Sequence, residues 1–529
     1  MDRALKTGKD VVKGSFWLFT GRAFSTLFLA GGTIFLGVFI GADDYGLYSI
    51  ALILPITLLL FQDWGVGSAM TKFCALFIRE KREKELQKLI KVALVFEGAT
   101  ASLLTIIALL MANFVASLLY SNNESAVFFI TIASIVILPS SFLSTIQSIF
   151  IGFEKMKLYS ILLVCQAVLQ SILSILLVYL NYGAFGAILG YILSFIGAAM
   201  LALTLLHFKI LKKLQNDHTS SIGLNVSQAL RLLLSFGIPL GISNILGGIS
   251  TQSHSFLKAS FVNLAMIGNY KIAHNFTIML SFITTPINTV LFPAYAKIDP
   301  YSERQVLKSI FKSSVKYVSL LLVPATMALM VLSKPLIGTI YADKWPYAPL
   351  FLSFGVIGNL FIVFGNVIIS SLLTGLAKTN FLMKMQMLNI VVSLPLAFIL
   401  IPLFGILGSI FAGFVAGIPT LIYSLHFLWK HYKLKADYRT SGKIFLASSM
   451  AALVTWSFLS FFSAAAWIIL TIGATIFLTI YVIFCPLIGA VNQEDLSNLK
   501  LIFSTLGFIS TLVNIPLNLM EWVLKLKRN

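Results

Sequence analysis

The sequence predicts an all-α integral membrane protein with about fourteen transmembrane helices. Of its 529 residues, 58% are hydrophobic and only 11% are charged, and the mean hydropathy is +0.94. Soluble globular domains carry about 25% charged residues. Uncharged stretches long enough to cross a hydrocarbon core of about 30 Å recur along the whole chain, as expected of spanning helices. These apolar runs are continuous and do not alternate, which excludes a transmembrane β-barrel.

Charged loops separate the predicted spans, whose centres lie near residues 28, 54, 104, 138, 170, 196, 244, 282, 323, 361, 392, 416, 453 and 478. Most of the 38 lysines and arginines fall in alternate loops, such as "KFCALFIREKREKELQKLIK" and "KHYKLKADYRTSGK", while "GADDYG" and "NYGAFG" hold none. Cytoplasmic loops carry the excess of basic residues in membrane proteins. We therefore expect a multi-pass protein of the cell membrane, plasma or inner, with both termini in the cytoplasm.

Two halves of the chain resemble each other at an offset of 222 residues. The matching positions are Gly46 with Gly268, Gly183 with Gly405, Gly186 with Gly408, and "YSIA" at 48–51 with "YKIA" at 270–273. Matches in the same order at a nearly constant offset indicate an internal repeat. Each half has six spans, an even number, so both halves enter from the same side in the parallel arrangement used by some transporters.

The repeat and the spans together predict four parts. They are an N-lobe of spans 1–6 (residues 1–218), a C-lobe of spans 7–12 (219–436), two accessory spans (437–490), and an interfacial or cytoplasmic segment (491–529). Within the last part, residues 501–520 are uncharged and long enough to cross. Crossing would place "KLKRN" outside, so we expect a helix lying in the inner interface, with a further span as the alternative.

Polar stripes on two repeat-related spans form the predicted substrate site. On the first span, one helix face carries Arg22, Ser25, Thr26, Ala30 and Thr33. On the seventh, polar and small residues follow the same spacing from Asn244 to Lys258. Because polar side chains facing lipid are costly, we expect both stripes to line a cavity between the lobes. The predicted binding residues are Arg22, Ser25, Thr26, Asn244, Thr251, Gln252, His254 and Lys258.

A purely structural role competes with binding at both cationic positions. Arg22 lies near the start of its span, so its long side chain could reach the inner interface. Lys258 should lie near the outer end of its helix and could reach outer headgroups. The equivalent placement of the two stripes favours a binding role for Arg22. For Lys258, binding and a structural role are equally supported.

Two carboxylates within the apolar region, Asp63 and Glu97, are the candidates for coupling transport to an ion. Asp63 could instead pair with a nearby base in the turn "QDWGVGSAMTK". Glu97 follows Lys91 by six residues and could reach the interface. Both alternatives stay open at the level of sequence.

The sequence offers no cofactor, metal or catalytic site. Cys74, Cys165 and Cys485 have no metal-ligand spacing, and no GxxxxGK[ST] phosphate loop is present. No water-exposed segment is large enough for a catalytic domain. The basic residues collect in alternate loops, so we expect no nucleic acid partner. These observations favour a transporter over an enzyme.

Several motifs resemble the Wzx-type flippases of lipid-linked oligosaccharides, within the multidrug/oligosaccharidyl-lipid/polysaccharide superfamily. They are "LGVFIGADDYGLYSIA" after the first span, "LFPAYAKI" at 291–298, "LSKPLIGTIYADKWPYA" at 332–348, and "NYGAFGAILG". The resemblance covers essentially the whole chain and agrees with the length and the duplicated halves. It implies alternating access, in which a sugar headgroup crosses while its lipid tail stays in the bilayer.

The resemblance implies a polyprenyl phosphate- or pyrophosphate-linked oligosaccharide as substrate, with membrane lipid and a glycan polymerase or glycosyltransferases of the same pathway as partners. Related lipid II flippases hold the pyrophosphate with cavity arginines, one of them on the first span, and Arg22 matches that position. Related multidrug exporters have an acidic residue in the first span, which is absent here. A cation-coupled exporter of small amphiphiles is the alternative function, and a membrane glycosyltransferase is a weaker one.

Overall fold

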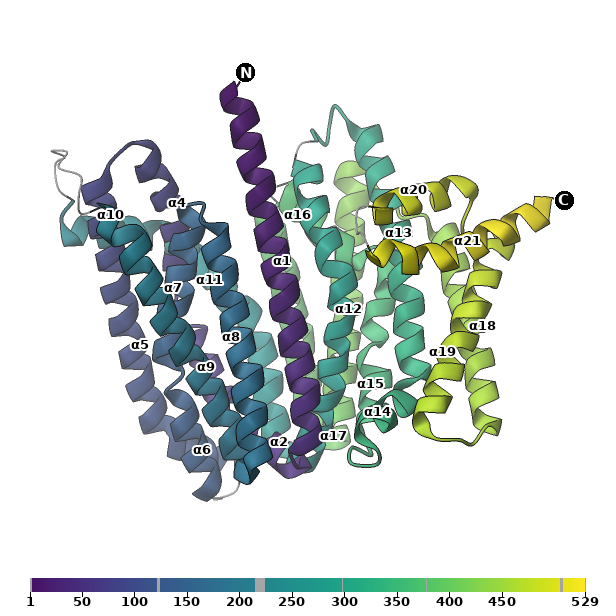
Figure 1. Cartoon of the computed structure of the whole chain (residues 1–529), viewed down its shortest axis with the longest axis horizontal. Coiled ribbons are helices and arrows are strands. Elements are labelled where there is room, and N and C mark those ends of the chain that lie inside the picture. The colour runs from purple at the N-terminus through teal and green to yellow at the C-terminus, as the bar shows by residue number, and fades with distance from the viewer. Residues whose placement is uncertain are drawn as a thin grey trace. The chain divides into compact units, whose positions relative to one another are not determined.

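The computed structural model describes residues 2–120, 124–214, 224–296, 298–376, 378–504 and 508–528. Within these ranges the chain forms helices joined by turns, without a β-strand (Figure 1), which confirms the all-α prediction. The helices of the N-terminal half are α1 (Asp2–Phe39), α2 (Ala42–Ala51), α3 (Ile53–Leu59), α4 (Val66–Arg79), α5 (Glu83–Tyr120), α6 (Glu124–Ser134), α7 (Ile137–Gly152), α8 (Met156–Leu177), η1 (Val178–Tyr182), α9 (Gly183–Leu206), η2 (His207–Leu211), α10 (Lys212–Leu214) and α11 (Val226–Phe261).

The helices that follow are α12 (Leu264–Ala296), α13 (Arg304–Val331), α14 (Ser333–Tyr341), α15 (Ala348–Gly355), η3 (Ile357–Phe364), α16 (Asn366–Gly375), α17 (Thr379–Tyr432), α18 (Tyr438–Phe461), α19 (Ala466–Leu487), α20 (Gln493–Ser504) and α21 (Phe508–Arg528).

In the described ranges, nine helical stretches are long and apolar enough to cross a membrane. A tenth is the pair Ala348–Phe364 and Asn366–Gly375, which is bent by 58°. Two of the nine, Met156–Leu211 and Asn380–Tyr432, have 56 and 53 residues, enough for two crossings each at about 1.5 Å per residue. The chain is therefore a multi-pass membrane protein, while the total of fourteen spans stays a prediction.

Both long stretches contain a break in helical geometry at repeat-related glycines. Gly183 has φ 50° and ψ −134°, and Gly405, 222 positions later, has φ 57° and ψ −129°. A side chain strongly disfavours this backbone region, whereas glycine adopts it freely. The same unusual conformation at matched positions agrees with the predicted internal repeat.

Contacts between residues divide the chain into two compact units. Unit 1 comprises residues 1–272 with 397–409, and unit 2 comprises 273–396 with 410–529. The predicted boundary between the lobes, at residues 218 and 219, lies outside the described ranges. The four-part division stays a prediction.

In unit 1, α1 packs closely along α8 through small residues. Gly21 lies against Ser160 and Gly32 lies against Ser171, eleven residues further along each helix. Ser160 Oγ donates a hydrogen bond to the Trp17 carbonyl, and Ser171 Oγ donates one to the Phe28 carbonyl at 2.7 Å. Small residues and hydroxyl bonds of this kind hold membrane helices together in the absence of a strong hydrophobic drive.

The short helix α2 crosses the start of α12 in unit 1 with a symmetric pair of backbone contacts. A Cβ added to Gly46 would overlap the carbonyl of Leu264, and one added to Gly268 would overlap the carbonyl of Ala42. Leu264 follows Ala42 by 222 residues, as Gly268 follows Gly46. The crossing therefore joins equivalent segments of the two halves, and only glycine fits at its two contact points.

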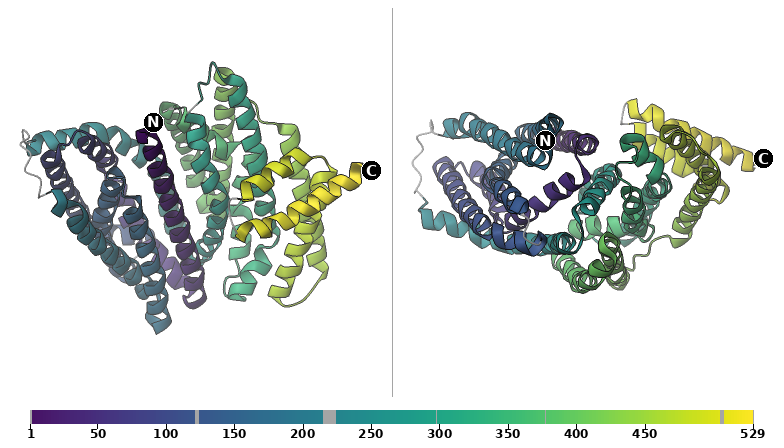
Figure 2. Two further views of the ribbon diagram at one scale, coloured as in Figure 1. Left: turned by 45° about the horizontal axis from the view of Figure 1, so that its top comes forward. Right: turned by 90° about the horizontal axis from the view of Figure 1, so that it is seen from below.

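Unit 2 ends in helices that differ in direction. The helices α18 and α19 pack as a pair beside α13, where the buried Tyr481 hydroxyl donates a hydrogen bond to the Leu320 carbonyl at 2.8 Å. Beyond them, α20 and α21 run across the direction of α18 and α19 (Figures 1 and 2). The ion pair of Lys500 with Glu521, at 2.6 Å, joins these last two helices.

The segment 501–520 is divided between two helices, because α20 ends at Ser504 and α21 begins at Phe508. Residues 505–507 lie outside the described ranges. The transverse direction of both helices is the one expected of an interfacial segment. Its position relative to a bilayer stays a prediction.

We expect Gly268→Ala to destabilise the protein, because the added methyl group overlaps the Ala42 carbonyl. Overpacking of this kind costs about 1–3 kcal/mol. The matched control is Gly442→Ala in α18, where a Cβ meets nothing within 4 Å and alanine favours the helix. Thermal unfolding in detergent should show a lower midpoint for Gly268→Ala only. Equal midpoints for the two variants would contradict the close crossing.

Candidate functional site

The carboxylate of Glu97 is completely buried inside unit 1. It lies on α5 with 0% exposure, where Gln62 Nε2 donates a hydrogen bond to its Oε2 and Ser141 Oγ lies 3.3 Å from the same oxygen. The other oxygen, Oε1, has no hydrogen-bond partner in the described part of the chain. A charged carboxylate left half unpaired in such surroundings is costly. The site is therefore suited to a group that gains and loses a proton.

Asp63 lies close to Glu97, on the turn between α3 and α4. Its Oδ1 accepts a hydrogen bond from the Gly67 N–H at 2.7 Å, and its charge is close enough to act on Glu97. The two carboxylates that are separate candidates for ion coupling thus lie in the same part of unit 1, and their role in coupling stays a prediction. Asp63 caps the first turn of α4, a role that the sequence reading did not foresee.

The turn that carries Gln62 and Asp63 also supports α11. Gly237 and Gly241 pack on the backbone of Trp64 and Gly65, and Gly248 packs on the side chain of Leu60. Gly65 has φ 77°, a conformation that favours glycine. The turn thus contacts Glu97 through Gln62 and contacts α11 through Leu60, Trp64 and Gly65.

The predicted stripe on α1 is divided between buried and exposed positions. Arg22 is exposed and Ser25 is 7% exposed, while Thr26 is half-buried. The Thr26 hydroxyl donates to the Arg22 carbonyl at 2.8 Å, so its proton is already engaged. The Arg22 side chain forms no ion pair or hydrogen bond with a residue of the described ranges. It is therefore the member of this stripe best placed to meet an anion.

The predicted stripe on α11 changes character along its length. Asn244 and Thr251 are exposed, and Gln252 is half-buried. Further on, His254 Nδ1 lies 3.2 Å from Ser409 Oγ of α17, and the Lys258 ammonium lies 4.1 Å from the centre of the Tyr270 ring. A cation over an aromatic face is stabilised by the ring quadrupole. Lys258 therefore has a partner within unit 1.

A second lysine, Lys271 on α12, lies within electrostatic range of Lys258. His254 is within range of Lys258 as well. Neither lysine forms an ion pair with a described residue, so no acidic side chain in the described ranges neutralises the positive charge at this place. The sequence reading missed Lys271, although it belongs to the repeat motif "YKIA". The repeat alignment could have revealed it, because the matching residue in "YSIA" is the neutral Ser49, and a charge present in only one half calls for an explanation.

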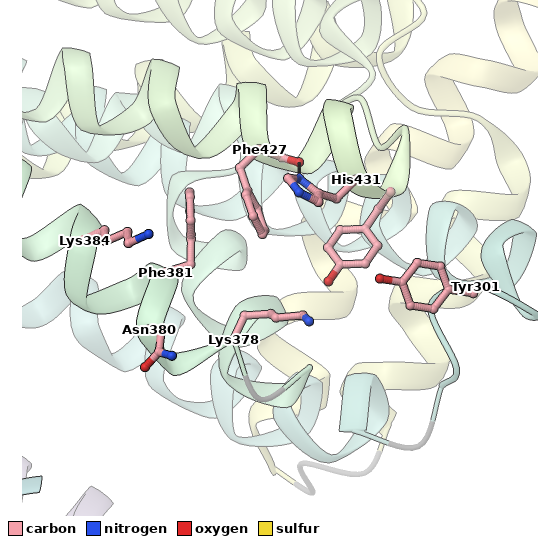
Figure 3. A pocket seen from close by; sticks show the side chains of 8 residues that line it. Tyr301, Lys378, Asn380, Phe381, Lys384, Phe427 and His431 are labelled. Atoms are coloured by element: carbon pink, nitrogen blue, oxygen red, sulfur yellow. Dashed lines mark hydrogen bonds between the residues drawn. The ribbon is translucent and has the colours of Figure 1, made fainter. Parts of the chain in front are cut away.

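Unit 2 contains a separate pocket of about 380 Å³ where the two ends of α17 meet (Figure 3). Its polar lining comprises Tyr301, Lys378, Asn380, Lys384, His431 and Tyr432. None of these residues was singled out from the sequence. The lysines belong to basic loops that the sequence reading used only to orient the chain.

In the described ranges, no three His, Cys, Asp or Glu side chains gather as metal ligands. The three cysteines are free, with Cys74 and Cys485 buried. The candidate polar groups in unit 1 are the carboxylates of the buried Glu97 and the half-buried Asp63, and the cationic side chains.

The fold is similar to known transporters. The lipid II flippase MurJ, in an inward closed conformation, matches with a TM-score of 0.71 over 89% of this chain and 98% of that one, at 16% identity. A multidrug resistance MATE family transporter of the MOP superfamily, in an inward-facing conformation, matches with a TM-score of 0.57 over 81% and 95%, at 13% identity. At these identities the likeness concerns the fold alone.

Two curated relatives match parts of the sequence. The probable low-salt glycan biosynthesis flippase Agl15 of Haloferax volcanii is 23% identical over 255 residues, 48% of this chain and 51% of the relative. The lipopolysaccharide biosynthesis protein WzxC of Escherichia coli is 29% identical over 164 residues, 31% of this chain and 32% of the relative. The chain thus spans about half the length of the first and a third of the second.

A family model described as "Polysaccharide biosynthesis protein" matches residues 35–348, more than half of the chain. The matched range includes Glu97 on α5, Asp63 on the turn between α3 and α4, the stripe on α11, and Lys271. The chain belongs to this polysaccharide biosynthesis protein family.

Proposed function

We propose that the protein is a flippase, which carries polyprenyl phosphate- or pyrophosphate-linked oligosaccharide from the cytoplasmic to the outer leaflet by alternating access. Its family and the names of its relatives support this class of function. The observation that carries the proposal is the pair of uncompensated lysines, Lys258 and Lys271, in the membrane part of unit 1. The linking phosphate is the anion that they would meet.

Two like charges held close together favour an anionic ligand. Charge-assisted hydrogen bonds to phosphate replace the hydration that a headgroup loses on leaving water. In the absence of the ligand, Lys258 and Lys271 repel each other, and the ring of Tyr270 offsets only part of that cost. The predicted binding residues Asn244, Thr251, Gln252 and His254 would contact the sugar or the phosphate from the same helix.

Arg22 offers a second cationic position at a different depth. Arg22 lies seventeen residues before the end of α1 at Phe39, whereas Lys258 lies three residues before the end of α11 at Phe261. The difference corresponds to roughly 20 Å along the helices. In the proposed cycle the phosphate enters near Arg22, beside Ser25 and Thr26, and leaves near Lys258 and Lys271.

Glu97 and Asp63 are the proposed coupling groups. The protonated carboxyl of Glu97 is neutral, so its burial is not costly. Loss of the proton would create a negative charge beside Asp63. The repulsion would displace the turn between α3 and α4, on which α11 rests through Gly237 and Gly241. Proton movement would thereby act on the helix that carries Lys258.

We infer a plasma or inner membrane location with both termini in the cytoplasm, because the basic loops gather on one side. Enzymes that build or polymerise the same glycan are the proposed pathway partners. A cation-coupled amphiphile exporter is the second candidate, supported by the buried acid Glu97 and by the MATE-like fold.

Replacing Lys271 with glutamine should slow headgroup translocation at least tenfold and raise the thermal midpoint. The substitution would remove the repulsion between Lys271 and Lys258, which stabilises the protein. It would also remove part of the anion site, which slows transport. Translocation in proteoliposomes and unfolding in detergent measure the two effects. The control is Lys308→Gln on the exposed face of α13. A lower midpoint with unchanged transport would show that Lys271 has a structural role only.

Replacing Arg22 with alanine should abolish translocation with little loss of stability, because its side chain is exposed. Arg22→Lys should retain part of the activity, since it keeps the charge but loses the planar fork that grips phosphate. Reconstituted vesicles with a labelled lipid-linked oligosaccharide provide the measurement. Full activity of the alanine variant would mean that Arg22 only reaches the inner interface.

Replacing Glu97 with glutamine should make residual transport independent of an imposed pH gradient, and at least tenfold slower. Glutamine imitates the protonated acid and cannot release a proton. Transport at varied gradients is the measurement, with the exposed Glu494→Gln as control. Retained gradient dependence would remove Glu97 from coupling. If drug efflux is lost in this variant while Arg22→Ala leaves efflux intact, the exporter is favoured.

A further inference from the structure

The pocket at the ends of α17 has a rigid aromatic wall. Phe381 stacks on Phe427 with ring centres 3.8 Å apart, and the His431 ring lies 4.2 Å from Phe427. His431 Nδ1 lies 3.1 Å from the Phe427 carbonyl. Because a carbonyl only accepts hydrogen bonds, Nδ1 carries the hydrogen, and this bond fixes the ring against Phe427.

Two tyrosines, Tyr432 and Tyr301, line the pocket side by side. Tyr432 is 1% exposed, and its hydroxyl forms no hydrogen bond with a residue of the described ranges. Its backbone is fixed, because Arg304 Nε donates to the Tyr432 carbonyl at 3.0 Å. Tyr301 lies beside it, with ring centres 6.2 Å apart. The Tyr432 hydroxyl is therefore available to donate a hydrogen bond to a group inside the pocket.

The charge of the pocket is positive. Lys378 and Lys384 form no ion pair with a described residue, and Figure 3 shows the Lys378 amine and the Tyr301 hydroxyl pointing into the same space. The nearest acids along the chain are engaged in their own turn: Asp299 Oδ1 accepts from Tyr301 N at 2.9 Å, and Glu303 Oε2 accepts from Asp299 N at 3.1 Å. Ammonium and phenol donors around one space suit a phosphate group.

The position of the pocket favours a lipid as the source of that phosphate. The stretch Asn380–Tyr432 is apolar enough to cross a membrane, so its two ends lie near headgroup level. Trp429 is 43% exposed, with the Lys433 and Lys435 ammonium groups over its ring at 4.7 and 5.9 Å. Exposed tryptophan with basic neighbours is typical of the membrane interface.

We propose that this pocket binds the phosphate of an anionic phospholipid headgroup in the leaflet that faces the basic loops. The lysines and the two tyrosine hydroxyls hold the phosphate oxygens, and the Phe381 and Phe427 wall fixes the shape. The site lies wholly in unit 2 and does not depend on the transported substrate. Its occupancy would fix the two ends of α17 at the membrane surface.

Native mass spectrometry of the full chain tests the proposal, with phosphatidylglycerol as probe and phosphatidylcholine as the neutral comparison. Lys378→Ala with Lys384→Ala should weaken phosphatidylglycerol retention about tenfold or more. Tyr432→Phe removes only the unpartnered hydroxyl and should weaken retention severalfold without unfolding. The matched control is Lys433→Ala with Lys435→Ala, which removes two charges stacked on Trp429 outside the pocket.

Inorganic pyrophosphate distinguishes the source of the phosphate. Displacement of phosphatidylglycerol from the wild type, but not from the double pocket variant, supports a lipid phosphate bound in the pocket. Pyrophosphate binding without lipid retention would overturn the lipid assignment and leave a soluble anion. Equal loss of lipid in the pocket and control variants, or equal retention of both lipids by the wild type, would overturn the site.

Discussion

The close crossing of α2 and α12 is the constraint on which the arrangement of unit 1 depends. Two glycines, Gly46 and Gly268, each meet a backbone carbonyl of the opposite segment, and both contacts repeat with the same offset of 222 residues. The turn between α11 and α12 follows from it, with Asn263 Oδ1 accepting from Met266 N at 2.9 Å. Lys258 and Lys271 lie on either side of this turn. The packing that joins equivalent segments of the repeat therefore also brings the two cations together.

Charged groups inside an apolar protein are tolerated when each has a defined role, because every one is costly there. In unit 1 the acid and the bases lie on different elements: Glu97 on α5, and the lysines on α11 and α12. The turn from Leu60 to Gly65 connects them, since one side bonds Glu97 through Gln62 and the other supports α11. This mechanical link gives a proposed route from proton binding to anion binding that requires no direct contact between the two sets of charges.

The sequence was sufficient to predict the all-helical membrane fold, because hydropathy and length decide it. The repeat was also visible, and the matched backbone of Gly183 and Gly405 agrees with it. The neighbours of each polar residue could not be predicted, because they depend on packing between distant helices. Lys271 was overlooked although His274 and Asn275 follow it at helical spacing, and Gln62 was one amide among many. The pocket on α17 is formed by two helix ends that are far apart in sequence and meet only after the chain reverses.

The central claim is that the cationic groups recognise the anionic link between lipid and sugar. The most direct measurement compares translocation of two substrates in proteoliposomes, with the same glycan and the same polyprenyl tail. One carries a diphosphate link and the other an uncharged link. We expect the diphosphate substrate to be translocated at least tenfold faster. A tenfold difference in rate corresponds to about 1.4 kcal/mol, which is less than the loss of one hydrogen bond to a charged group. Equal rates for the two substrates would contradict it.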